Sequence, residues 1–251
     1  MLKEAILKID GHELRVEMRR RKGSRHLRMH INYRNTLSVS LPWHCSQVVA
    51  WDFVEQQRPW IREQLVLTPP PVVLSEWLKL HPQLSASGRV HAVRLERSVG
   101  RSRCRYYFAR NEDVLVLEWP RGSDEASLLR LVRSFAGDAL RCRLLYQTKR
   151  LGIDLPQISV RDQSSCWGSC SSKRRLSLNW RLILIPQALQ DYVILHELAH
   201  LREMNHSRQF WALLEEYDPD RLKHEADLDG CSPRIMRVGR KPGCHGSSYG
   251  K

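Results

Sequence analysis

Residues 196–206 read HELAHLREMNH, and the spacing of the histidines in this stretch decides which fold the surrounding chain must build. On a helix, residues four positions apart lie above one another on one face, so His196 and His200 can present ring nitrogens to a single metal ion. Glu197 is displaced by about 100° around the helix axis, which sets its carboxylate beside the ion. The stretch therefore predicts a helix that carries two metal ligands and a general base.

A catalytic zinc site of this kind needs a third protein ligand, and both Glu203 and His206 are candidates. If the helix continued, Glu203 would lie about 10 Å along the axis from His196, so it is expected to be an outer partner of the site. His206 can reach the ion only if the helix ends first, and Asn205 is expected to form the corner because asparagine tolerates the left-handed conformation. Ser207 would then cap the next helix.

The segments around this stretch are expected to be regular. Pro186 can open a helix over residues 186–203, and residues 157–162 and 175–183 are predicted strands on either side of the loop QSSCWGSCSSKR, residues 163–174. The strand over residues 175–183 fits two interpretations equally well: an edge strand along which an extended substrate pairs, or an internal strand of the core. A long helix is predicted from Asp124 towards Arg150.

The N-terminal part of the chain alternates apolar and polar residues. Residues 14–18, 27–31 and 37–41 are predicted to form a small antiparallel β-meander, followed by a helix capped by Ser46. Residues 90–120 form a second strand-rich block that precedes the long helix, but the two blocks do not align and no repeat is predicted. The predicted fold class is α+β: an N-terminal antiparallel meander plus helix, then a zincin-like α+β domain with the HExxH helix.

Changes in composition suggest boundaries along the chain. The expected parts are a strand-rich region with a helix over residues 1–67, a proline-rich linker over 68–88, a zincin-like domain that carries the HExxH helix over 89–230, and a flexible basic tail over 231–251.

The net charge of +14 favours an anionic partner such as a nucleotide or a nucleic acid. Seven scattered cysteines do not indicate a disulfide framework, and a reducing compartment is expected. No apolar run approaches the roughly 20 residues that span a bilayer, and the N-terminus lacks the apolar core of a signal peptide. A cytoplasmic protein without membrane insertion is therefore expected.

Cys166 and Cys170 could suggest a second metal site. Their CxxxC spacing has no matching pair nearby, so two small buried thiols in a glycine-containing turn are the favoured interpretation. Tyr192, one turn before His196, could donate a hydrogen bond to a developing oxyanion, although packing is the more common role of a tyrosine on an apolar face.

Residues 160–220 resemble the YgjP-like zinc metallopeptidase family, which is related to the SprT-like and WLM groups. The matching pieces are WGSC (residues 167–170), LNWRLI (178–183), YVILHELAHL (192–201) and NHSRQFW (205–211). The earlier chain also looks like that family, so the resemblance covers most of residues 1–230. It implies that His196, His200 and His206 bind zinc and that Glu197 is the catalytic carboxylate. One departure is Cys166, which stands where the family commonly has a basic residue.

These observations predict a zinc-dependent hydrolase, a metallopeptidase that cleaves peptide bonds of a peptide or protein substrate by Glu197-assisted attack of zinc-bound water. One alternative is a metal-dependent nucleoside triphosphate pyrophosphatase, an activity also attributed within the family. It draws on the basic residues Arg161, Lys173, Arg174 and Arg175. A second alternative, a basic nucleic-acid-binding module with a structural zinc, would leave Glu197 without a role.

Overall fold

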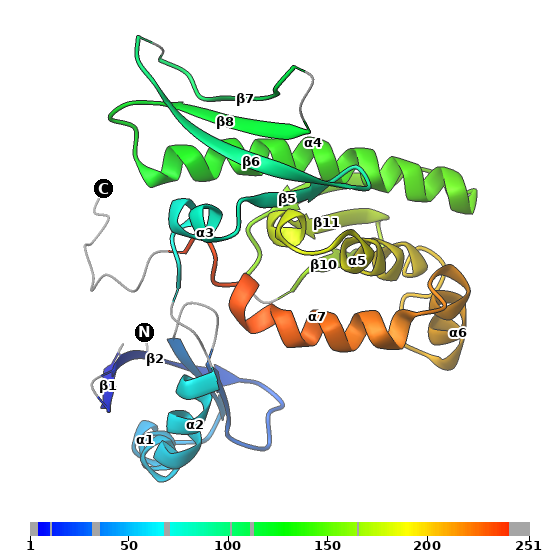
Figure 1. Cartoon of the computed structure of the whole chain (residues 1–251). Coiled ribbons are helices and arrows are strands. Elements are labelled where there is room, and N and C mark those ends of the chain that lie inside the picture. The colour runs from blue at the N-terminus through cyan, green and yellow to red at the C-terminus, as the bar shows by residue number, and fades with distance from the viewer. Residues whose placement is uncertain are drawn as a thin grey trace. The chain divides into compact units, whose positions relative to one another are not determined.

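The structure is a computed structural model, which describes residues 5–10, 12–31, 36–67, 71–100, 102–110, 113–164 and 166–240. The chain folds into two compact units, which meet in the sequence after Val72, just beyond the proline cluster (Figure 1). One compact unit holds the described residues up to Val72, and the other is Val73–Gly239. All residues of the predicted metal site belong to the second unit.

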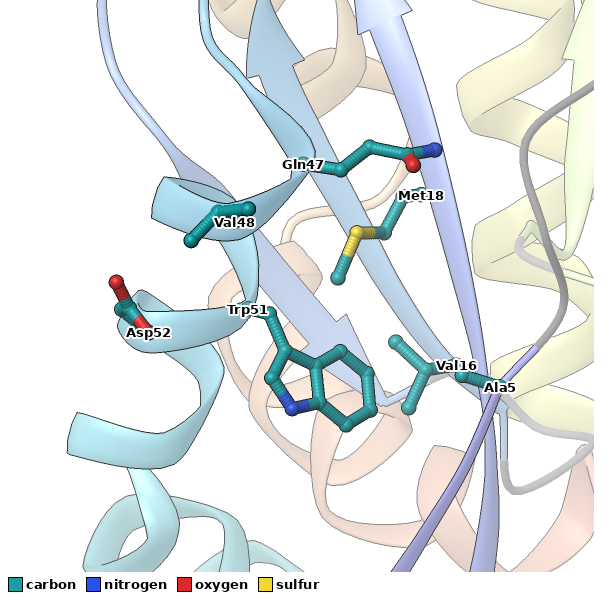
Figure 2. A pocket seen from close by; sticks show the side chains of 7 residues that line it. All are labelled: Ala5, Val16, Met18, Gln47, Val48, Trp51 and Asp52. Atoms are coloured by element: carbon teal, nitrogen blue, oxygen red, sulfur yellow. The ribbon is translucent and has the colours of Figure 1, made fainter.

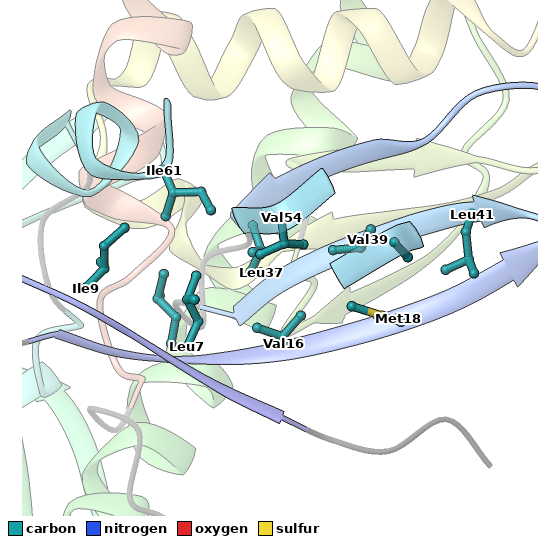
Figure 3. Packing of buried hydrophobic residues seen from close by; sticks show 11 residues of the cluster. Leu7, Ile9, Val16, Met18, Leu37, Val39, Leu41, Val54 and Ile61 are labelled. Atoms are coloured by element: carbon teal, nitrogen blue, oxygen red, sulfur yellow. The ribbon is translucent and has the colours of Figure 1, made fainter. Parts of the chain in front are cut away.

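The first unit is a four-stranded sheet packed against two helices. Its elements are β1 (Ala5–Ile9), β2 (His12–Arg21), β3 (Arg28–Ile31), β4 (Thr36–Pro42), α1 (Gln47–Gln56) and α2 (Arg58–Leu67). Leu14, Val16 and Met18 of β2 and Leu37, Val39 and Leu41 of β4 are buried on one face of the sheet. They belong to one apolar cluster with Ala50 of α1 and with Val54 and Ile61, two helix residues that Figure 3 labels. Ser46 caps α1 as predicted, because its side chain accepts a hydrogen bond from the Val49 amide at 3.2 Å.

The order of the strands corrects the predicted meander. The sheet runs β1-β2-β4-β3, and β4 pairs with β2 in parallel, so the sheet is mixed. β4 takes a central position because it has more apolar side chains to bury than β3. Leu37, Val39 and Leu41 of β4 are at most 1% exposed, whereas Arg28 and His30 of β3 are exposed. The expected turn NYRN, residues 32–35, lies outside the described residues.

The second unit begins with a helix and a second four-stranded sheet. These elements are α3 (Leu74–Leu80), β5 (Gln83–Ala86), β6 (Arg89–Ser98), β7 (Arg105–Phe108), β8 (Val114–Pro120) and the long helix α4 (Glu125–Leu151). The structure differs here from the expected linker over residues 68–88, because α3 and β5 occupy much of it. Leu74, Trp77 and Leu78 of α3 are buried, so this segment is part of the core.

The second sheet repeats the arrangement of the first. Its order is β5-β6-β8-β7, again with a parallel central pair. The central ladders match pair by pair, from Arg15↔Thr36 to Arg21↔Pro42 in the first sheet and from Ala92↔Val114 to Ser98↔Pro120 in the second. The outer ladders also match, from Arg28↔Ser40 to Ile31↔Leu37 and from Arg105↔Glu118 to Phe108↔Leu115.

Residues with a positive φ and helix caps also occupy equivalent positions in the two copies. Left-handed residues stand at equivalent turns, Asp10 (φ 46°) and Ser87 (φ 52°), then Gly23 (φ 79°) and Gly100 (φ 76°). The helix that follows each sheet starts at an equivalent cap, since the side chains of Ser46 and Asp124 each accept from the amide three residues on. The chain therefore contains two copies of one ββββα arrangement, which its sequence does not reveal.

The rest of the second unit holds a small sheet and three helices. The elements are β9 (Gln157–Arg161), β10 (Gly168–Cys170), β11 (Arg175–Asn179), the 3-10 helix η1 (Trp180–Leu184), α5 (Gln187–Ala199), α6 (Arg208–Tyr217) and α7 (Arg221–Ile235). β11 is the middle strand of the order β10-β11-β9, and Leu176, Leu178 and Trp180 are at most 1% exposed. The edge-strand interpretation is therefore wrong. The internal strand is confirmed only for residues 175–179, because η1 takes the place of the predicted strand from Trp180 onward.

The ordered chain extends beyond the predicted start of a flexible tail at residue 231. α7 continues to Ile235, and Met236 and Val238 are at most 1% exposed, so these apolar side chains outweigh the basic, glycine-containing composition. Residues 241–251 lie outside the described residues. None of the helices described combines the length and apolar character that crossing a membrane requires.

Candidate metal centre

Three histidines from two adjoining segments form one cluster. His196 lies in the last turn of α5, His200 is its C-terminal cap residue, and His206 follows in the turn before α6. One ligand nitrogen from each lies within 4.8 Å of the others, and Nε2 of His196 is 3.0 Å from Nε2 of His206. Within the described ranges, no other group of three or more histidine, cysteine, aspartate or glutamate side chains has this geometry.

The turn that brings His206 back begins earlier than predicted. α5 ends at Ala199, and the amide of Arg202 already donates to the Ala199 carbonyl at 3.0 Å, so the helix tightens before the chain reverses. Asn205 is not among the described residues with a positive φ, so the expected left-handed corner is wrong. Its carbonyl instead accepts from the Ser207 amide at 2.7 Å. Ser207 caps α6 as predicted.

Glu203 contributes to the cluster through its main chain. The ring nitrogen Nδ1 of His200 is 3.0 Å from the Glu203 carbonyl oxygen. A proton on Nδ1 that is donated to this carbonyl leaves Nε2 of His200 free for a metal, which is the usual way a ligand histidine is oriented. Glu203 thus takes an outer position, and it does so with an atom that every residue has.

Aromatic rings and burial surround the histidine cluster. The His200 ring stacks on Phe210 with centroids 4.5 Å apart, and the His206 ring stacks on Trp211 at 5.5 Å. Burial, together with the neighbouring histidines, lowers the pKa of His196 to about 4, and burial also lowers the pKa of His200. A neutral imidazole is the form that binds a metal ion.

Glu197 is a buried carboxyl group next to the histidine cluster. Its side chain is 6% exposed, and burial raises its pKa to about 8. Its Oε2 has no hydrogen-bond partner among the described residues, although a buried polar atom without a partner is costly. Such an atom at the wall of a cavity is arranged to meet a water molecule or a substrate.

The cavity beside Glu197 has a volume of about 200 Å³, and acidic residues from α7 form part of its wall. Its lining residues are Trp167, Gly168, Tyr192, Val193, His196, Glu197, Glu225, Leu228 and Asp229. Sequence reasoning missed Glu225 and Asp229 because it did not predict α7. Their spacing of four, which places two carboxylates on one helix face, was the available signal.

Asn179 and Arg181 hold the loop that forms the other wall. The fully buried Asn179 amide donates to the carbonyls of Gln163 at 3.1 Å and Cys166 at 3.0 Å. The buried Arg181 guanidinium donates to the Asp162 carboxylate at 2.6 Å and to the Val238 carbonyl at 2.8 Å. These contacts fix the WGSC segment against α5.

Cys166 and Cys170 are free thiols close to Glu197. Burial raises the pKa of each thiol, and the negative charge of Glu197 raises it further. Neither belongs to a metal-binding group within the described ranges. Both thiols are half-buried where the sequence suggested buried ones, and Cys170 lies in β10 instead of in a turn.

Gly168 of β10 packs its backbone directly on the Glu197 side chain. A Cβ atom at this position would lie 2.6 Å from Glu197 Oε1 and 2.7 Å from its Cγ, which is closer than real Cβ contacts allow. Only glycine leaves room for the carboxylate where it stands. The loop thus determines the position of Glu197.

Replacement of Gly168 by alanine is expected to displace the Glu197 carboxylate and to lower kcat for hydrolysis by about 100-fold, the typical cost of a misplaced catalytic group. Metal content should remain unchanged, because the histidines are not touched. The matched control is Gly137→Ala in α4, where a Cβ meets nothing within 4 Å. Steady-state kinetics and zinc content of both variants check this. Unchanged kcat in Gly168→Ala would show that the contact does not position Glu197.

Comparisons with known proteins identify a family for this chain. The sequence model of a family described as "YgjP-like, metallopeptidase domain" matches residues 25–230. A solved structure, "Crystal structure of the metallopeptidase zymogen of Pyrococcus abyssi abylysin", is 22% identical over 37% of this chain and 95% of that chain, with a TM-score of 0.33. That TM-score is too low to support any argument, and no curated protein matches the chain. The match over residues 25–230 covers most of the sequence, and the chain therefore belongs to the YgjP-like metallopeptidase family.

Proposed function

We propose that this protein is a zinc-dependent peptidase in which His196, His200 and His206 hold the metal and Glu197 is the general base. The observation that carries the proposal is the buried Glu197 carboxyl group, whose Oε2 is unpartnered among the described residues, beside three clustered histidines and a cavity. Metal sites that are purely structural have no use for such a group.

The donor set fits zinc. Three neutral imidazole nitrogens are typical protein ligands of a catalytic zinc ion, which keeps a further position open. When bound, the ion would supply Lewis-acid polarisation of the substrate carbonyl and would make water more acidic. The protein supplies the proton transfers and the shape of the cavity.

Glu197 moves the proton. Its Oε2 accepts a proton from the attacking water as the new C–O bond forms, and it then donates that proton to the leaving amine as the C–N bond breaks. The raised pKa of Glu197, caused by burial, suits a group that must both take and return a proton near neutral pH.

The geometry of β10 suggests how an extended substrate binds. β10 is an edge strand of its sheet, and Gly168 at its start lines the cavity. A peptide that adds to this edge as a further strand would run past Glu197. We therefore place the substrate along β10, in place of the β11 edge that the sequence allowed.

The charge of the cavity favours a peptide over a nucleoside triphosphate. Glu225 and Asp229 contribute carboxylates to its wall, and Arg161, Lys173, Arg174 and Arg175 do not line it. Carboxylates repel the phosphates of a nucleotide and attract basic side chains of a peptide. The cavity therefore fits a peptide with a basic residue next to the cleaved bond.

The test compares substrates side by side. Zinc-loaded protein should hydrolyse an unfolded protein or peptides that contain lysine or arginine, release no pyrophosphate or phosphate from nucleoside triphosphates, and lose activity when a chelator removes the metal. Mass spectrometry of the peptide products and an assay for released phosphate give the two readouts. Chelator-sensitive cleavage of nucleotides without cleavage of peptides would replace this proposal by the pyrophosphatase alternative.

A further inference from the structure

The first unit contains an apolar cavity outside the metal centre. It measures about 320 Å³ and lies between β1, β2 and α1, where its lining residues are Ala5, Val16, Met18, Gln47, Val48, Trp51 and Asp52. Figure 2 shows the Trp51 ring of α1 facing the Val16 and Met18 side chains of β2 across it. The hydrolytic chemistry described above makes no use of this cavity.

Helix α1 is apolar on two sides, which is unusual for a surface helix. One side carries Ala50 and Val54, both fully buried in the core. The side that lines the cavity carries Val48, which is 70% exposed. An exposed valine beside a half-buried tryptophan at a cavity indicates a surface that another apolar group covers.

The second copy of the ββββα arrangement shows what covers the equivalent place. There Glu125, the first residue of its helix, accepts a hydrogen bond from the Ser75 amide of α3 at 2.8 Å. At the other end of α3, the Pro82 carbonyl accepts from the Val93 amide at 2.8 Å. In the first copy, Gln47 and Val16 hold the positions of Glu125 and Val93, and both line the cavity.

Helix α3 thus runs from the point equivalent to Gln47 to within two residues of Pro82, whose equivalent in the first copy is Ala5. Gln47 and Ala5 both line the cavity of the first copy. Helix α3 places Leu74 and Leu78 one turn apart on one face, and these are 0% and 1% exposed. Within the described residues, the first copy has no helix in this position. The position is therefore filled by α3 in the second copy and left open by the described residues of the first.

We propose that the cavity of the first unit binds a short amphipathic helix of another protein in the position that α3 holds in the second. The helix would insert two apolar side chains one turn apart. Asp52 lies at the rim of the cavity, at the position that Arg130 holds in the second copy. Because the Asp52 carboxylate attracts a positive charge, we expect the bound helix to carry a basic residue beside its apolar face. The α3 helix of a second copy of this chain does not qualify, because its own unit buries Leu74 and Leu78.

The probe is a labelled peptide with the sequence of residues 72–82, VVLSEWLKLHP, in its natural form and with Glu76→Lys. Fluorescence anisotropy with the full chain should show saturable binding of both peptides, tighter for Glu76→Lys. Val48→Glu in the full chain should weaken binding by at least about tenfold, because it places a charge in the apolar cavity.

Val49→Glu is the matched control. Val49 is 53% exposed and does not line the cavity, so this variant should bind both peptides within about twofold of the unchanged chain. Asp52→Lys should reverse the preference between the two peptides. Circular dichroism verifies that each variant is folded.

Three outcomes would overturn the inference. The first is the absence of saturable binding by either peptide, and the second is equal weakening in Val48→Glu and Val49→Glu. The third is self-association of the chain in sedimentation experiments that Val48→Glu abolishes, because the occupant would then be a second copy. None of these readouts depends on hydrolytic activity or on bound metal.

Discussion

Glu197→Gln is expected to lower kcat for peptide hydrolysis by about 10²- to 10⁴-fold, the usual contribution of a general base. Glutamine has nearly the same size, so it fits the buried position against Gly168, but its amide cannot take a proton from water. Zinc content and thermal stability should stay close to those of the unchanged protein, since no histidine is altered. Product formation and bound zinc, measured on the same preparation, give both values.

The control for this variant is Glu203→Gln, which changes a carboxylate in the turn that follows α5 without touching the carbonyl that contacts His200. It should retain kcat within about twofold. If Glu197→Gln remained as active as this control, Glu197 would not be the base, and the buried carboxyl group would need another explanation.

His206→Ala is expected to empty the metal site, whereas Glu203→Ala should largely keep it. Loss of an outer partner typically costs 10- to 100-fold in metal affinity, and loss of a ligand should cost more than about 100-fold. Glu203→Ala should cost less than either, because alanine still provides the main-chain carbonyl 3.0 Å from His200 Nδ1. Zinc retained after dialysis against a weak competing chelator distinguishes the two variants.

The reverse result, an empty site in Glu203→Ala and a filled one in His206→Ala, would make the Glu203 carboxylate the third ligand. His44→Ala, in the other unit and outside the cluster, provides the background level of zinc binding for both measurements.

The histidine cluster was predictable because it depends on residues that are close together in the sequence. The spacing of His196 and His200 on a helix and the distance of Glu203 along it follow from helix geometry alone. The path of the chain from α5 to His206 could not be predicted in this way. Several local backbone hydrogen bonds between α5 and α6 together reverse the chain direction. The residue type at Asn205 suggested one left-handed residue where the backbone uses none.

The remaining features of the site depend on partners distant in sequence. Gly168 lies against Glu197 only because Asn179 ties the loop to β11, and Glu225 reaches the cavity only because α7 packs on α5. The contact of Gly168 leaves no periodic pattern in the sequence, and the spacing of Glu225 and Asp229 indicates a shared helix face without showing what that face contacts. The predicted meander failed for a related reason, since alternation shows which residues face inward but not which strand is central.

The repeat escaped the sequence because its copies share backbone requirements more than side chains. Gly23 and Gly100 occupy equivalent left-handed turns, but caps and core positions use different residues, such as Ser46 and Asp124. Hydrogen-bond register, which the sequence does not display, is the property that the copies have in common.

The long helix α4 ties the metal centre to strands that contain none of its ligands. α4 packs on β8 and also on α5, where Arg143 donates to the Asp191 carboxylate at 2.7 Å and 2.5 Å (Figure 1). Elements joined in this way tend to open together in native-state fluctuations. An ion that binds only the folded form makes such opening less favourable by mass action, so metal should increase amide hydrogen-exchange protection in β8 as well as in α5.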